Sequence, residues 1–161
     1  MKTLNQYIKE KLVINKDYRD NTIVVKSFDE LRKIIEDRYD KLGPGTKKNP
    51  IDFNDIDVSN LNSFCGNDDN GLFEKTKFKY IDISDWDVSN VTNMSYMFCN
   101  CENFNQNISS WDVSKVTDMC SMFYRCESFN QDLSKWKVSK VRWHSYMFGG
   151  CPIKKEYKPK F

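Results

Sequence analysis

The sequence predicts an α/β repeat protein, a right-handed solenoid of about four coils with a small α/β cap at its N-terminal end. Three observations support this fold class. Nearly the same segment is written three times, as "WDVSNVTNMSYMFCNC" from Trp86, "WDVSKVTDMCSMFYRC" from Trp111 and "WKVSKVRWHSYMFGGC" from Trp136. The positions that recur between the copies are apolar. The segment before residue 50 lacks the repeat and has helix and strand patterns instead.

The N-terminal segment predicts a helix–strand–helix cap over residues 1–45. "TLNQYIKEKL" places apolar side chains on one helical face, and "NTIVVKS" predicts a short strand. "SFDELRKIIEDRYDKLG" predicts a second helix with a capping box, Ser27 with Glu30, and a terminating Gly43. The ends of a solenoid must shield apolar faces, so we expect this segment to cover the first coil. The apolar faces of the two helices are Leu4, Tyr7, Ile8 and Leu12, and Leu31, Ile34, Ile35 and Leu42.

The repeats align at a period of 25 residues and supply the core. A fixed period of this size is typical of units that bury their hydrophobic sides against one another. The aligned columns are Trp86/Trp111/Trp136, Val88/Val113/Val138, Val91/Val116/Val141, Met97/Met122/Met147, Phe98/Phe123/Phe148 and Cys101/Cys126/Cys151.

An earlier, degenerate copy, "NDIDVSNLNSF", precedes these three at an offset of 30 residues. The extra residues fall in the loop-like stretch "CGNDDNG". The sequence therefore predicts four units, residues 51–80, 81–105, 106–130 and 131–155, followed by a basic tail at 156–161.

Within each unit the pattern predicts one strand and one turn. Apolar and polar residues alternate around Trp111, which favours a short strand near "SSWDVS". Val116, Met119 and Met122 then follow at a spacing of three residues, which is typical of a helical or 3₁₀ turn. Stacked units of this kind would form a parallel sheet along one side.

The spacing V-x-x-M-x-x-M-F-x-x-C-x-x-F resembles the leucine-rich repeats of BspA-type bacterial surface proteins, including a repeat of unknown function found in mycoplasma and gut bacterial proteins. The resemblance covers residues 51–155 and recurs in register. It implies a leucine-rich-repeat-like solenoid whose relatives bind proteins. The chain has only four units and shows no export signal or lipid-anchor cysteine, which argues against surface adhesion.

Charge is distributed unevenly along the repeats. Residues 81–130 carry a net charge of −5, whereas residues 131–161 carry +6. Charged residues interrupt the N-terminal apolar positions, so no secretory signal is predicted, and no segment has the roughly 20 apolar residues of a membrane span. We expect a cytoplasmic protein that does not bind membranes.

Six cysteines are present, but none forms C-x-x-C. Stacking would align Cys101, Cys126 and Cys151 at distances that do not forbid a disulfide, and a buried column of thiols is the simpler interpretation. A zinc site would need four ligands, and the chain has a single histidine, His144. We therefore expect no metal and no other cofactor.

The sequence also offers no catalytic grouping. No nucleophile elbow, glycine-rich phosphate loop or H-E-x-x-H is present. Asp87 and Asp112 form a carboxylate pair only because they occupy equivalent places in two repeats. We expect a protein that is not an enzyme.

Two sets of outward residues are candidate partner-binding sites. In the first, Asp87 and Asp112 follow the alternation that turns Trp86 inward and form one row with Asp57, and Asp85 belongs to a neighbouring outward row. Like charges on neighbouring units repel. Either each aspartate accepts hydrogen bonds from the following turn, which is the interpretation that we favour, or the row is an acidic surface for a basic partner.

The second set is basic and aromatic and lies in the last unit. Trp143 stands where the earlier units have Asn93 and Asp118, so we expect it to be exposed. Such a set suits a protein interface, a nucleic-acid strand or a solvated cap. Its candidate residues are Lys135, Lys137, Lys140, Arg142, Trp143 and Tyr146.

The leading functional prediction is a non-enzymatic module that binds another protein through the outward strand face and the basic last coil. The alternatives are nucleic-acid binding through the basic end and a surface adhesion repeat. The N-terminal "LNQYIKEKLVIN" resembles the N-termini of some bacteriophage proteins. That resemblance implies a phage-encoded inhibitor acting in the host cytoplasm on a bacterial immune protein, such as a defence nuclease. The oligomeric state is not predicted.

Overall fold

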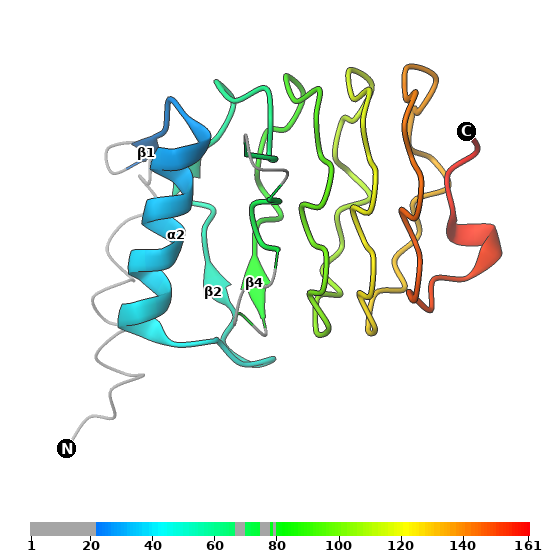
Figure 1. Cartoon of the computed structure of the whole chain (residues 1–161). Coiled ribbons are helices and arrows are strands. Elements are labelled where there is room, and N and C mark those ends of the chain that lie inside the picture. The colour runs from blue at the N-terminus through cyan, green and yellow to red at the C-terminus, as the bar shows by residue number, and fades with distance from the viewer. Residues whose placement is uncertain (1–21, 67–69, 75–77, 79) are drawn as a thin grey trace.

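In the computed structural model, the chain places one helix at one end of a row of stacked units (Figure 1). The structure describes residues 22–66, 70–74, 78 and 80–161. The predicted first helix and the phage-like segment "LNQYIKEKLVIN" lie outside these residues. The units follow one another in chain order from the blue helix to the red C-terminal segment.

The second predicted helix is present as α2 (Phe28–Leu42). Its start is defined by Ser27, whose Oγ accepts a hydrogen bond of 3.1 Å from the Glu30 amide. The Glu30 carboxylate reaches back to the amide of Lys26, one residue before the predicted partner. Gly43, at φ 73°, ends the helix. Leu31 and Ile35 are buried as expected, whereas Leu42 is 59% exposed and does not belong to the packed face.

The predicted fold class is wrong. A right-handed, leucine-rich-repeat-like solenoid with a parallel sheet along one side requires a strand in every unit. The described residues contain strands of two residues only, in two separate two-stranded parallel sheets, β1–β3 and β2–β4. The strands are β1 (Ile23–Val24), β2 (Ile51–Asp52), β3 (Ile56–Asp57) and β4 (Ile81–Asp82), and η2 (Lys155–Tyr157) is a short 3₁₀ helix.

Tight turns replace the strand that was expected around Trp111. The Trp111 amide donates to the Ile108 carbonyl at 3.1 Å, and the Val116 amide donates to the Val113 carbonyl at 3.0 Å. The Asp112 carboxylate accepts the amide of Ser114 at 3.0 Å. These local bonds occupy the backbone groups that a strand ladder would need. Alternation of apolar and polar residues therefore marks burial here, not a strand.

Contacts between units keep the repeat register without a continuous sheet. Single parallel bridges join Ser63 to Asn93, Asn93 to Asp118 and Asp118 to Trp143. The first bridge spans 30 residues and the next two span 25, as in the sequence alignment. We call the stacked residues 51–155 the repeat array.

Aromatic columns fill the centre of the array. Trp86, Trp111 and Trp136 are each 5% exposed or less. The Phe73, Phe98, Phe123 and Phe148 rings stack with successive centroid distances of 5.7, 5.6 and 5.6 Å. The indole nitrogens of Trp86 and Trp136 donate to the carbonyls of Phe53 and Ile108. Buried Trp111 has no acceptor for its indole N–H within the described part of the chain.

We predict that Trp111→Ala lowers the free energy of unfolding by about 3–5 kcal/mol, because it removes a large side chain from the middle of the stack. Trp143→Ala is the matched control, since Trp143 is 54% exposed, and it should change stability by about 0.5 kcal/mol or less. Urea unfolding measures both. Equal destabilisation by the two variants would contradict the inward position of Trp111.

Candidate partner-binding surface

The structure places the nine candidate residues on the surface, in two regions. Asp85, Asp87 and Asp112 lie on adjacent units in the middle of the array, and all three are exposed. The other six belong to the last unit, and they too are exposed. They are Lys135, Lys137, Lys140, Arg142, Trp143 and Tyr146.

The aspartate row has a local structural role. The carboxylates of Asp57, Asp87 and Asp112 each accept the backbone amide two residues later, at 2.9 to 3.0 Å. Hydrogen bonds from the amide and hydroxyl of Ser89 lower the pKa of Asp87, which outweighs the repulsion from Asp112. These bonds confirm the interpretation that each aspartate closes its own turn.

Asp85 differs from the three turn-closing aspartates. Its backbone amide donates to the side-chain oxygen of Asn54 in the preceding unit at 3.0 Å. Among the described residues, no hydrogen bond to the Asp85 carboxylate is present. Asp85 is therefore a free surface charge beside Asp87 and not part of the turn.

The second region is a run of exposed side chains from Arg142 to Tyr146. Trp143 is 54% exposed and Tyr146 is 76% exposed. In the two preceding units, the residues equivalent to 143–146 are at least partly buried. Met94 and Met119 are fully buried, whereas His144 in the same column is exposed. We call residues 142–150 the terminal edge.

The C-terminal tail packs beside the terminal edge, which the sequence did not predict. The His144 and Phe161 rings stack with centroids 4.1 Å apart. The Lys158 ammonium lies 5.4 Å from the centre of the Phe148 ring. The Tyr157 carbonyl accepts the Leu133 amide at 2.8 Å. Residues 156–161 are therefore not a simple solvated tail. The sequence feature that indicates this packing is Phe161, which lies one repeat period of 25 residues after Trp136.

The six cysteines, all within the described residues, form no disulfide. The thiols of Cys101 and Cys126 donate to the carbonyls of Phe73 and Phe98 at 3.1 and 2.9 Å. Burial raises the pKa of the Cys126 thiol, so it is a poor nucleophile. The cysteine column therefore packs inside the array as free thiols, in agreement with the simpler interpretation of the sequence.

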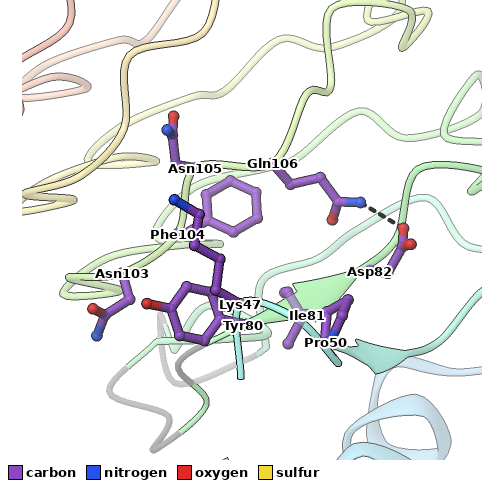
Figure 2. A pocket seen from close by; sticks show the side chains of 9 residues that line it. All are labelled: Lys47, Pro50, Tyr80, Ile81, Asp82, Asn103, Phe104, Asn105 and Gln106. Atoms are coloured by element: carbon purple, nitrogen blue, oxygen red, sulfur yellow. Dashed lines mark hydrogen bonds between the residues drawn. The ribbon is translucent and has the colours of Figure 1, made fainter. Parts of the chain in front are cut away.

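A shallow pocket opens on the side of the array, between Tyr80–Asp82 and residues 103–106 (Figure 2). The Gln106 amide donates to the Asp82 carboxylate across it. Burial raises the pKa of Asp82, but the hydrogen bonds from Ser84, Asn54 and Gln106 together have the larger effect and hold that pKa below the ordinary 3.8. The pocket contains no nucleophile next to a base.

The described parts of the chain lack two further kinds of site. No group of three or more His, Cys, Asp or Glu residues there is arranged to hold a metal ion. Nor is any helix there both long enough and apolar enough to cross a bilayer.

Comparison with protein families gives a match to most of the chain. The model described as "Mycoplasma protein of unknown function, DUF285" matches residues 49–156, about two thirds of the chain. Comparisons with curated proteins and with solved structures give no match. The matched range coincides with the repeat array.

We predict that Asp112→Ala destabilises the folded protein by about 1 kcal/mol at pH 7, because the Ser114 amide loses its acceptor. Asp112→Asn keeps an acceptor oxygen but loses the charge, so it should destabilise the protein less than Asp112→Ala does. Hydrogen bonds from the Ser114 hydroxyl and amide hold the pKa of Asp112 below the ordinary 3.8. The stabilisation is therefore complete above the unfolded-state value and is lost as pH falls through the lower folded-state pKa.

Urea unfolding between pH 7 and pH 2 measures this effect. The difference between wild type and Asp112→Ala should shrink at the acid end of the series. Equal stability of wild type and Asp112→Ala at pH 7 would show that the turn does not depend on the carboxylate.

We predict that Cys126 reacts with iodoacetamide only after unfolding, because its thiol is fully buried and bonded to a carbonyl. Partly exposed Cys120 should react in the folded protein. Peptide mass spectrometry after labelling distinguishes the two, and labelling in guanidinium should reach all six cysteines. Labelling of Cys126 at the rate of Cys120 would disprove its burial.

Proposed function

This chain belongs to the family described as "Mycoplasma protein of unknown function, DUF285", and we propose that it is a non-enzymatic module that binds another protein through the terminal edge of its repeat array. The observation that carries the proposal is the exposure of Trp143 and Tyr146 beside Arg142. Large aromatics and arginine are the residues most often found at the energetic centre of protein interfaces.

A solvated cap does not account for this surface. A capping unit needs polar residues at its outer face, and Arg142 fits that need. Trp143 does not, because its counterparts Asn93 and Asp118 accept the amides of Ser95 and Cys120. Tryptophan at this place gives up that bond and exposes apolar area, which favours a contact with a partner.

The basic charge supports a second candidate, a nucleic acid. Eight of the ten charged residues in 131–161 are basic, and lysine or arginine with aromatics suits a phosphate-bearing strand. The two classes differ in salt dependence. Binding to phosphates falls steeply with salt because counterions are released, whereas a contact centred on Trp143 depends mainly on apolar burial.

The acidic row is a weaker candidate surface. Asp87 and Asp112 already accept local amides, so their presence is explained without a partner. The hypothesis that the partner is a host defence nuclease depends on the N-terminal segment, which lies outside the described residues. The terminal edge does not add support for that hypothesis.

We predict that Arg142→Ala with Trp143→Ala weakens partner binding by about 2 kcal/mol or more while the protein stays folded. The full-length chain serves as bait for capture from cell extract, and calorimetry with the purified partner gives the affinity. Lys41→Ala with Leu42→Ala is the matched control, since it also removes one cation and one exposed apolar side chain, at the other end of the molecule.

The control pair should bind as wild type does. Unchanged affinity of the Arg142/Trp143 pair would move the interface away from the terminal edge. A tenfold or greater loss of affinity on raising the salt concentration, together with nuclease-sensitive capture, would favour the nucleic-acid alternative.

A further inference from the structure

Four rows of hydrogen-bonded peptide groups run along the repeat array. In one row, the Phe64 amide donates to Asn93, the Met94 amide to Asp118 and the Met119 amide to Trp143, at 2.8 to 2.9 Å. A second row begins with the Phe73 amide and includes the Phe98 and Phe123 amides, and the Tyr96 and Asn100 amides begin two more. In all four rows the N–H groups point toward the C-terminal end.

The rows stop at the terminal edge with their donors unused. By the 25-residue register, the next amides are those of His144, Tyr146, Phe148 and Gly150. None of the four donates to an acceptor within the described residues. One further row runs in the opposite direction, with its carbonyl groups toward the C-terminal end. In it the Thr117 carbonyl accepts the amides of Arg142 and Trp143, and the equivalent Arg142 carbonyl is left as an acceptor at the edge. At this edge the inter-unit rows thus end in four donors and one acceptor.

The peptide dipoles reinforce this imbalance. Aligned peptide groups place partial positive charge at the end where the N–H groups are free, and an ordinary sheet lacks this effect because its dipoles largely cancel. The surrounding segment, residues 131–161, carries a net charge of +6. Both contributions favour a ligand that is negative and accepts hydrogen bonds.

The other available occupants match the edge poorly. The tail lies beside it through side-chain contacts, since Phe161 stacks on His144 and Lys158 lies over Phe148, but within the described residues it accepts no hydrogen bond from the four amides. A second copy related by twofold symmetry would bring donors to donors and positive charge to positive charge. An uncharged strand would bring as many donors as acceptors.

We propose that the terminal edge binds an acidic segment of a partner protein, whose carboxylates and main-chain carbonyls accept hydrogen bonds from the His144, Tyr146, Phe148 and Gly150 amides. Carboxylates fit because they accept without donating and form strong charge-assisted bonds to backbone amides. This inference rests on the proposed function and adds the chemistry of recognition. Trp143 and Tyr146 would flank the segment as exposed aromatic walls.

The first test is an NMR titration of the full-length protein with a ten-residue peptide of alternating aspartate and valine. The four amide resonances should shift together. The peptide should bind at least tenfold more tightly than its asparagine–valine counterpart, which keeps the carbonyls but lacks the charge. The lysine–valine peptide should not bind.

The second test removes one donor at a time. Chemical ligation at Cys126 joins residues 1–125 to a synthetic segment 126–161 in which an ester replaces the Tyr146 amide. The fold should persist, because that N–H has no partner within the described structure. Affinity for the aspartate peptide should fall at least fivefold. An ester at Lys160, whose amide likewise has no described acceptor, is the matched control and should bind normally.

A simpler pair of variants covers the case in which ligation yields too little folded protein. His144→Pro removes a donor and His144→Ala keeps it, and both remove the imidazole. Weaker binding of the proline variant than of the alanine variant, at equal melting temperatures, supports the proposal. Equal binding by the two variants overturns it.

Other outcomes also overturn the inference. They are shifts confined to the Asp87 and Asp112 turns, equal affinity for the aspartate and asparagine peptides, dimer formation through the edge, and binding of a single-stranded oligonucleotide but not of the peptide. A captured partner that needs Trp143 but binds the ester variant normally would leave the proposed function intact and refute only the acidic-segment inference.

Discussion

The fold depends on how each short unit satisfies its backbone polar groups. A buried N–H or C=O without a partner is costly, and a 25-residue unit made of tight turns cannot pair all of its own. Some of these groups are paired within the unit, by bonds such as that from the Val91 amide to the Val88 carbonyl. Others are paired with the neighbouring unit, as in the bond from the Phe98 amide to the Met122 carbonyl. The bonds within a unit and the bonds between units are both needed to pair the backbone groups.

This division explains why the register is strict while regular secondary structure is scarce. A shift of one unit by a single residue would misplace every amide in the four rows and every ring in the phenylalanine column. The rows also require left-handed backbone at repeated places, Tyr96, Ser121 and Tyr146, with φ between 53° and 57°. Stacking and inter-unit hydrogen bonds must offset the strain that such residues carry.

The sequence was a good guide to burial and a poor guide to backbone path. Period and apolar columns correctly predicted that Trp111 and Phe123 are buried, and Ser27 and Gly43 marked the ends of α2. Strands were predicted from alternation near Trp111, but the Asp–x–Ser turns produce the same alternation. The left-handed column could not be read, since tyrosine and serine do not favour that conformation. At the candidate surface, the exposure of Trp143 could be predicted because it replaces Asn93 and Asp118 of the earlier units. The unbonded amides of the terminal edge could not be predicted, because they depend on the orientation of the peptide groups and not on the identity of the side chains.

The phenylalanine column has one more consequence, for how such proteins vary in size. Its rings recur every 25 residues at centroid distances near 5.6 Å, and each interior unit presents the same two faces to its neighbours. Inserting or deleting a whole interior unit would therefore change the length of the rod in fixed steps while both ends keep their chemistry. The length of the array and the binding chemistry of its ends can therefore change independently of each other.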